Sequence, residues 1–167
     1  MELNEKERFI IANQLKILEK LYPEEADYYA KHRKAVEHGY QLHYPWLVEH
    51  FYEEMTEGEC QEVLDILEMY RAITFSFKEL QDKSGIDEGR VRFSGFDGNN
   101  EGKQFSYAQY FIVDLGRFEE LSYDAKYPNF NSHREMLEKY RRMLQVWRGY
   151  QKRFELDRSQ LLKLLEA

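Results

Sequence analysis

The stretch EGECQEVLDILEMYRAITFSFKELQDK, residues 57–83, decides the fold class. It holds no proline, and Thr56 and Glu59 stand at its start with the spacing of a capping box. Its apolar residues recur at helical spacing on more than one face: Val63, Leu64, Ile66, Leu67, Tyr70, Ile73, Phe77 and Leu80. A helix that is apolar on two sides is usually central in a bundle, so this stretch predicts a helical fold built around it.

The residues before this stretch predict three further helices. Asn4 and Glu7 have capping-box spacing at the start of the first helix. Pro23 suits the first turn of a second helix, which should end at Gly39 in a left-handed cap. Pro45 opens a shorter helix that carries Trp46, Leu47, His50 and Phe51. The N-terminal third therefore reads as helical throughout.

The residues after the central stretch predict helices separated by two irregular segments. A helix is expected from about Asn100 to about Phe118, Ser132 and Glu135 form another capping box, and Asp157 caps a last short helix. Val91 and Phe93 alternate with arginines, as in a short extended segment. We therefore expect an all-α, single-domain bundle of about six or seven helices over residues 1–167. Its one irregular, short β-like excursion should lie near residues 84–100.

Composition and charge narrow the class of protein. The 167 residues are 43% hydrophobic and 16% aromatic, and the net charge is −7. An acidic protein repels phosphate backbones, which disfavours nucleic-acid binding. The polar N-terminus lacks the pattern of a signal peptide, and no apolar run approaches the roughly 18 residues of a membrane helix. With a single cysteine, Cys60, these features predict a cytoplasmic protein that does not enter the membrane.

The irregular segment near residues 84–100 is the first place to look for a ligand site. Long irregular segments inside compact domains are where functional residues tend to lie. The candidate ligand-binding residues are polar and charged: Arg90, Arg92, Asp97, Asn99, Asn100 and Glu101. The alternative is a structural loop in which Phe93 and Phe96 fill the core.

Two patterns suggest metal binding, and each fails on spacing. His32, His38, His43 and His50 cluster in sequence, and His50 with Glu54 would share a helix face, yet no HExxH or CxxC motif accompanies them. Residues 97–102 begin like a calcium loop, but the twelfth position is Ala108, where a glutamate is needed. We therefore expect no metal site and no cofactor.

The basic stretch near the C-terminus has two readings. Its cations are interleaved with Tyr140, Trp147, Tyr150 and Phe154, and aromatic rings among cations can stack on bases. The same pattern describes the core stripe and the solvent face of an amphipathic helix, which is the reading we favour. The cations are Lys139, Arg141, Arg142, Arg148, Lys152, Arg153 and Arg158.

Several strings resemble the YfbU family of bacterial proteins. They fall in order along the chain: LNEKERFIIANQLKILEKL from Leu3, DILEMYRAI, LQDKSGID, VRFSGFDGNNE, and LEKYRRMLQVW ending at Trp147. The resemblance implies a mostly helical, cytoplasmic bacterial protein, and it supplies no catalytic residues. Related domains are thought to occur beside helix-turn-helix segments, which implies a regulatory or ligand-sensing role.

These observations favour a non-enzymatic regulatory or interaction module that associates with itself. The aromatic surplus and the split between an acidic N-terminal region and a basic C-terminal helix predict a homodimer or larger assembly. A small molecule or another protein is a further expected partner. Two alternatives stay open: a hydrolase-type enzyme that uses carboxylates or histidine, and nucleic-acid binding through the basic C-terminal helix.

Overall fold

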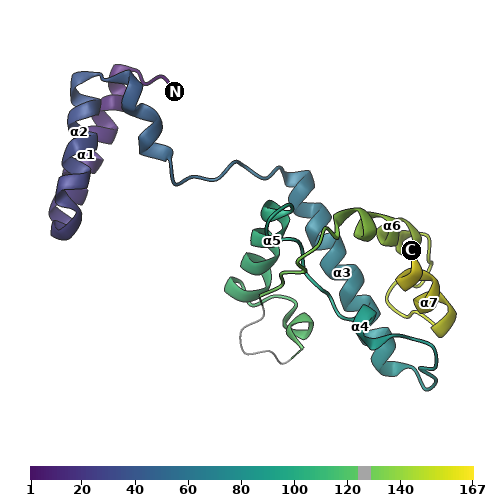
Figure 1. Cartoon of the computed structure of the whole chain (residues 1–167). Helices are drawn as coiled ribbons and strands as arrows, with labels where there is room; N and C mark the ends of the chain where they lie inside the picture. Colours follow the sequence, from purple (N-terminus) through teal and green to yellow (C-terminus); the bar gives the residue numbers. More distant parts are fainter. Residues whose placement is uncertain (124–128) are drawn as a thin grey trace. The chain divides into compact units, whose positions relative to one another are not determined.

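A computed structural model describes residues 1–123 and 129–167. The fold is all-α, as predicted (Figure 1). The chain divides into two compact units, Met1–Glu54 and Met55–Ala167, and each is described by itself. The two units are compact parts of one chain, and the expectation that residues 1–167 form a single domain stays a prediction. Within the described ranges, no helix combines the length and the apolar character needed to cross a membrane.

The N-terminal unit is a helical hairpin followed by a 3-10 segment. Its elements are α1 (Glu5–Leu21), the 3-10 turn η1 (Pro23–Glu25), α2 (Ala26–His38) and the 3-10 segment η2 (Gln41–Val48). The Asn4 side chain accepts from the backbone N–H of Glu7 at 3.0 Å, and the Glu7 carboxylate accepts from the N–H of Asn4 at 2.8 Å. Gly39 closes α2 at φ +73°, in the left-handed region that favours glycine. The predicted start of α1 and the predicted end of α2 are confirmed, whereas Pro23 begins a 3-10 turn and α2 itself begins at Ala26.

The predicted helix opening at Pro45 differs from the structure. The helical residues are Gln41–Val48 in 3-10 geometry, Pro45 lies inside this segment, and residues 51–56 are not helical. The physical reason is local: a residue that precedes proline disfavours the α conformation, and proline cannot donate a hydrogen bond within an α-helix. His50 and Glu54 therefore do not share a helix face.

The C-terminal unit is assembled around one long helix. Its elements are α3 (Glu57–Glu79), α4 (Glu88–Val91), α5 (Gly102–Gln109), the π turn η3 (Tyr110–Asp114), the 3-10 turn η4 (Glu119–Ser122), α6 (Leu137–Arg148) and α7 (Arg158–Glu166). A single helix was expected from about Asn100 to about Phe118. The structure has α5 from Gly102, followed by the π turn η3, which ends at Asp114. The capping boxes at Thr56 and Asp157 are both present.

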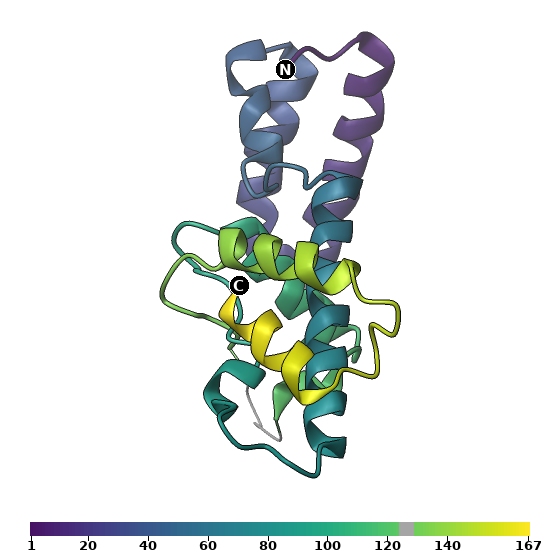
Figure 2. The same ribbon diagram turned by 90° about the vertical axis from the view of Figure 1, so that its right-hand side faces the viewer.

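Helix α3 lies at the centre of this unit, between α5 on one side and α6 with α7 on the other (Figures 1 and 2). Its residues Val63, Ile66, Leu67 and Ile73 are fully buried. The aromatic rings of Tyr70, Phe93, Phe96 and Tyr140 form a cluster against it, with centroids 5.3–5.8 Å apart. The two-sided apolar pattern of residues 57–83 thus predicted the central helix, although α3 ends at Glu79 and residues 80–83 are not helical.

The irregular segment joins the core through a short backbone contact. Phe96 and Asn131 form an isolated parallel bridge, in which Phe96 N donates to Phe130 O at 3.0 Å and Ser132 N donates to Phe96 O at 3.1 Å. Gly95 makes the approach possible, because a Cβ atom there would lie 1.7 Å from Phe130 O. Among the described residues, this bridge is the whole of the predicted β-like excursion.

The predicted capping box of Ser132 and Glu135 is wrong. Helix α6 begins at Leu137, five residues after Ser132, and the Ser132 hydroxyl donates instead to Arg134 O at 2.6 Å. The backbone N–H groups of Met136 and Leu137 donate to the carboxylate of Glu101. A distant buried carboxylate therefore occupies the place that the local pattern had assigned to serine.

Candidate functional site

Four of the six predicted site residues lie together in one turn. Asp97 Oδ1 accepts from the backbone N–H of Asn99 at 3.0 Å, and Asp97 Oδ2 accepts from Asn100 Nδ2 at 2.6 Å. These hydrogen bonds, the one from the Asn99 backbone first, hold the pKa of the Asp97 carboxyl below its ordinary value. Glu101 follows at the end of the same turn. The carboxylate of Asp97 thus stabilises the turn itself.

Glu101 connects this turn to α6. Its Oε2 accepts from Asp97 N at 2.9 Å, and its Oε1 accepts from Met136 N at 2.8 Å and Leu137 N at 2.6 Å. Both oxygens therefore accept hydrogen bonds from within the chain, and the residue is 6% exposed. These contacts support the structural-loop alternative for Asp97 and Glu101. Ligand binding by the predicted residues stays a prediction.

Arg90 and Arg92 lie apart from that turn. Arg92 stands over the Tyr123 ring, 5.3 Å from its centroid. Arg90 lines a cavity of about 530 Å³ together with Arg134, Lys139 and Arg142. The pKa of the Lys139 ammonium is lowered, first because burial penalises the charged form and then because the three guanidinium groups repel it.

The basic C-terminal stretch is largely paired within the chain. Arg141 binds Glu62 at 2.8 Å, and Arg148 binds Asp65. Arg158 Nε donates to Ser84 O at 2.8 Å. The aromatic residues between these cations include Tyr140 and Trp147, and both are buried in the core. These contacts support the amphipathic-helix reading of this stretch, because the rings of Tyr140 and Trp147 are not free to stack on bases, although Phe154 is 51% exposed.

The histidines of the N-terminal unit have different surroundings. His32 and His43 line one cavity, His38 stacks on Tyr40 at 5.4 Å, and His50 is exposed beside Glu49 at 3.7 Å. Among the residues that the structure describes, no group of three or more His, Cys, Asp and Glu side chains is arranged to hold a metal ion.

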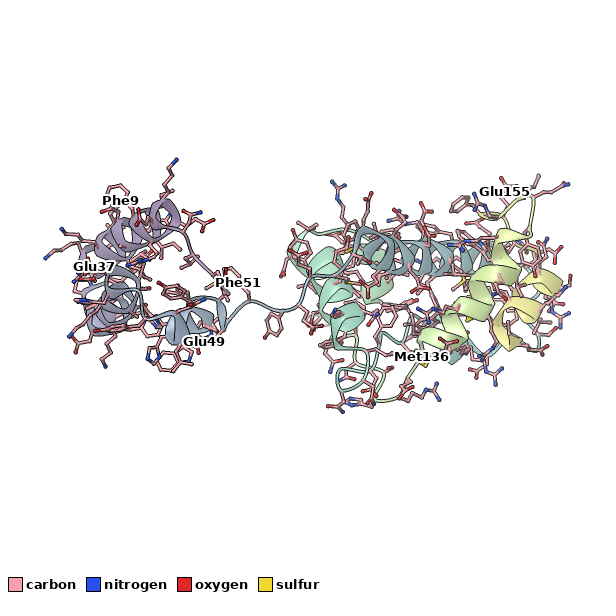
Figure 3. The ribbon with its side chains drawn as sticks, turned by 90° about the horizontal axis from the view of Figure 1, so that it is seen from above. Phe9, Glu37, Glu49, Phe51, Met136 and Glu155 are labelled. Carbon is pink, nitrogen blue, oxygen red and sulfur yellow. The ribbon has the colours of Figure 1, made fainter. Side chains whose placement is uncertain are left out.

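Helix α1 presents a second apolar stripe that the sequence reading missed. Ile11, Leu15 and Leu18 form its sheltered face, and Leu15 is buried. About 100° around the helix axis lie Ile10, Ile17 and Leu21, which are 54%, 57% and 65% exposed. Phe9, also exposed, lies on the outside of the hairpin (Figure 3). The spacing of seven and four residues between the stripe residues was a readable signal for this surface.

The hairpin also carries a cavity of about 490 Å³ lined by α2 and η2 together with Tyr40 and Glu49. Tyr28, Tyr40 and Trp46 contribute aromatic rings to it, and His32 and His43 contribute imidazoles. The ring of His32 lies 4.4 Å from that of Tyr28, and the ring of His43 lies 4.5 Å from that of Trp46. From the sequence, these histidines had been weighed as metal ligands, and that role had been disfavoured.

The elements of both units define an all-α protein, whose N-terminal unit carries an exposed apolar stripe on α1 and a cavity of about 490 Å³. The comparison with protein families identifies the family. The model of the YfbU domain matches residues 1–167, so the chain belongs to the YfbU family.

Proposed function

We propose that this protein is a self-associating interaction module, and that the stripe Ile10–Ile17–Leu21 on α1 packs against the same stripe of a second copy. The exposure of this stripe is the observation that carries the proposal. Such an arrangement places two helical hairpins together as a four-helix bundle. A regulatory role fits this proposal, because a bound molecule can change the equilibrium between the monomer and the associated form.

The small core of the hairpin supports the proposal. In the unit Met1–Glu54, three apolar side chains are buried, those of Leu15, Val36 and Tyr44. A chain segment this short buries too little surface to be more than marginally stable alone, and oligomerisation is a common remedy. Association would give the hairpin an apolar contact in addition to its own core.

Polar contacts fix the shape of the hairpin and so prepare the stripe for docking. Arg8 Nε donates to Val36 O at 2.8 Å, at the C-terminal end of α2. Arg33 binds Glu19 at 2.5 Å and Glu37 at 2.9 Å. Because the hairpin is held in place by these contacts, little ordering entropy should be lost when two copies meet.

A two-fold axis suits this surface. In a symmetric dimer the same patch meets itself, so a single apolar stripe is complementary to its own copy. Each stripe side chain that becomes fully buried contributes about 1.5–3 kcal/mol, whereas an exposed ion pair contributes about 0–1 kcal/mol. Apolar packing should therefore dominate, and association should persist at high salt.

Sedimentation velocity tests the proposal at low micromolar concentration in about 0.1 M and 1 M salt, where the screening length falls from about 10 Å to 3 Å. We expect a dimer or larger species in both. Ile17→Asp places a charge in both halves of the interface and should raise the dissociation constant at least about 100-fold. Ile17 is exposed within one copy, so the change removes no contact inside the hairpin, and circular dichroism should show that the variant is still folded and helical.

Val113→Asp is the matched control. Val113 is 52% exposed and lies in the C-terminal unit, so the same change there should leave association intact. A monomer for the parent chain in both salts would overturn the proposal. An equal loss of association in both variants would place the interface away from α1.

A further inference from the structure

The cavity of the N-terminal unit has the dimensions of a small-molecule site. Its volume of about 490 Å³ falls in the range of roughly 300–1,000 Å³ that is usual for ligand pockets. The rings of Tyr28, Tyr40 and Trp46 are 41%, 50% and 52% exposed at its walls. Large aromatic surfaces that remain open around a cavity are the part of a site that a planar apolar molecule would cover.

Two imidazoles at this cavity have no hydrogen-bond partner within residues 1–123 and 129–167. His32 is 7% exposed and lines the cavity without a hydrogen bond from any described residue. His43 Nδ1 is buried and has none either. Buried polar side chains are normally hydrogen-bonded, so each exception needs an explanation. The nitrogens of His32 are not fully buried, so they can meet polar atoms of a ligand beside the aromatic walls.

The charges around the cavity favour an anion. Lys31 and Lys34 line it, and within the described part of the chain neither forms an ion pair. The carboxylate of Glu49 is the opposing charge, and it faces the imidazole of His50 at 3.7 Å. Lys31 and Lys34 are both exposed to solvent. Their ammonium groups are available to bind a negatively charged group.

We propose that this cavity binds a small aromatic carboxylate. The ligand ring packs against Trp46, Tyr28 and Tyr40, its carboxylate pairs with Lys31 or Lys34, and the His32 imidazole hydrogen-bonds to its polar edge. Aromatic packing supplies most of the contact area, while the charges select an anion over a cation. None of the stripe residues of α1 lines the cavity, so the ligand and a second copy do not compete for the same side chains.

Calorimetric titration of the full chain with indole-3-acetate tests the proposal. A ligand of about 13 heavy atoms at about −0.3 kcal/mol per atom binds with a dissociation constant of about 1 mM. We expect binding at least this tight, and weaker or no binding for tryptamine, which carries the same ring with a positive charge. The double variant Lys31→Gln, Lys34→Gln should weaken indole-3-acetate about fivefold, as expected for two partly exposed charge contacts.

Lys16→Gln, Lys20→Gln is the matched control, because it removes the same charge from exposed positions of α1 outside the cavity. It should leave the affinity unchanged. Trp46→Leu should weaken binding while the helix content measured by circular dichroism stays that of the parent. Absence of binding, equal affinity for tryptamine, or equal losses in the two lysine variants would each overturn the proposal.

Discussion

Glu101 caps a helix that begins 36 residues further along the chain. Its Oε1 accepts hydrogen bonds from Met136 N at 2.8 Å and from Leu137 N at 2.6 Å. The first N–H groups of an α-helix have no partner within the helix, and a carboxylate also suits the positive end of the helix dipole. The polar turn after Phe96 thus contributes directly to the stability of α6.

Glu101→Ala should lower the free energy of unfolding by about 2–4 kcal/mol, because it leaves buried N–H groups without an acceptor. Glu101→Gln should lower it less, since an amide oxygen can still accept. Urea denaturation followed by circular dichroism measures both. Glu68→Ala, at an exposed position of α3, is the control and should change the free energy by less than about 0.5 kcal/mol. Equal effects of Glu101→Ala and Glu68→Ala would contradict the capping role.

Gly95→Ala should destabilise the C-terminal unit by at least about 2 kcal/mol. Gly95 has φ +84°, and an added Cβ would lie 1.7 Å from Phe130 O, so the backbone bridge to Asn131 must shift. Gly58→Ala gives the opposite sign. Apart from the adjacent residues and the backbone of its own helix, no atom lies within 4 Å of a Cβ there, and alanine in α3 should stabilise by about 0.5 kcal/mol. Thermal unfolding compares the two, and a neutral Gly95→Ala would refute the steric argument.

Trp147→Ala should lower the free energy of unfolding by about 3–5 kcal/mol, as is usual when a buried aromatic side chain is removed. Trp147 is 2% exposed, and its Nε1 donates to Arg153 O at 2.7 Å. Phe75→Ala, at a half-exposed position of α3, should cost under about 1 kcal/mol. Denaturant midpoints report both changes. A midpoint for Trp147→Ala equal to that of the parent would exclude its place in the core.

Arg90→Gln should raise the pKa of Lys139 toward its ordinary value, because it removes one of the cations that repel the ammonium group. The folded-state pKa of Lys139 lies below that of the unfolded chain, which is about 10.4. Stability should therefore rise with pH between those two values, and Arg90→Gln should reduce that rise. NMR titration of the lysine side chain measures the pKa. Arg153→Gln, outside this cavity, should leave it unchanged.

The sequence predicted those helix boundaries that depend on neighbouring residues. Asn4 with Glu7, Thr56 with Glu59, and Asp157 all cap the helices that follow them. Each of these caps is complete within about one helical turn, so residue identity and spacing suffice. The start of α6 could not be predicted in this way, because its acceptor is far upstream and Ser132 offered a plausible local alternative.

The candidate surfaces were predictable only in part. The sequence shows that the histidines cluster, but their spacing was compared only with metal-binding motifs. The fold brings His32 and His43 to the same cavity as Trp46, and the sequence alone does not show this. The exposed stripe of α1 is visible as a second apolar period. Its exposure could not be foreseen, because a sequence does not show which of two apolar faces the partner helix covers.

The long reach of Glu101 has a consequence for the order of events during synthesis. The carboxylate leaves the ribosome 35 residues before the N–H group of Met136, which corresponds to about 2–7 s at ordinary translation rates. The acceptor for α6 is therefore made before the helix that needs it. When residues 137–148 emerge, the Glu101 carboxylate is already present to accept from their first N–H groups. The same residues as an isolated peptide would begin with unsatisfied N–H groups and would form less helix.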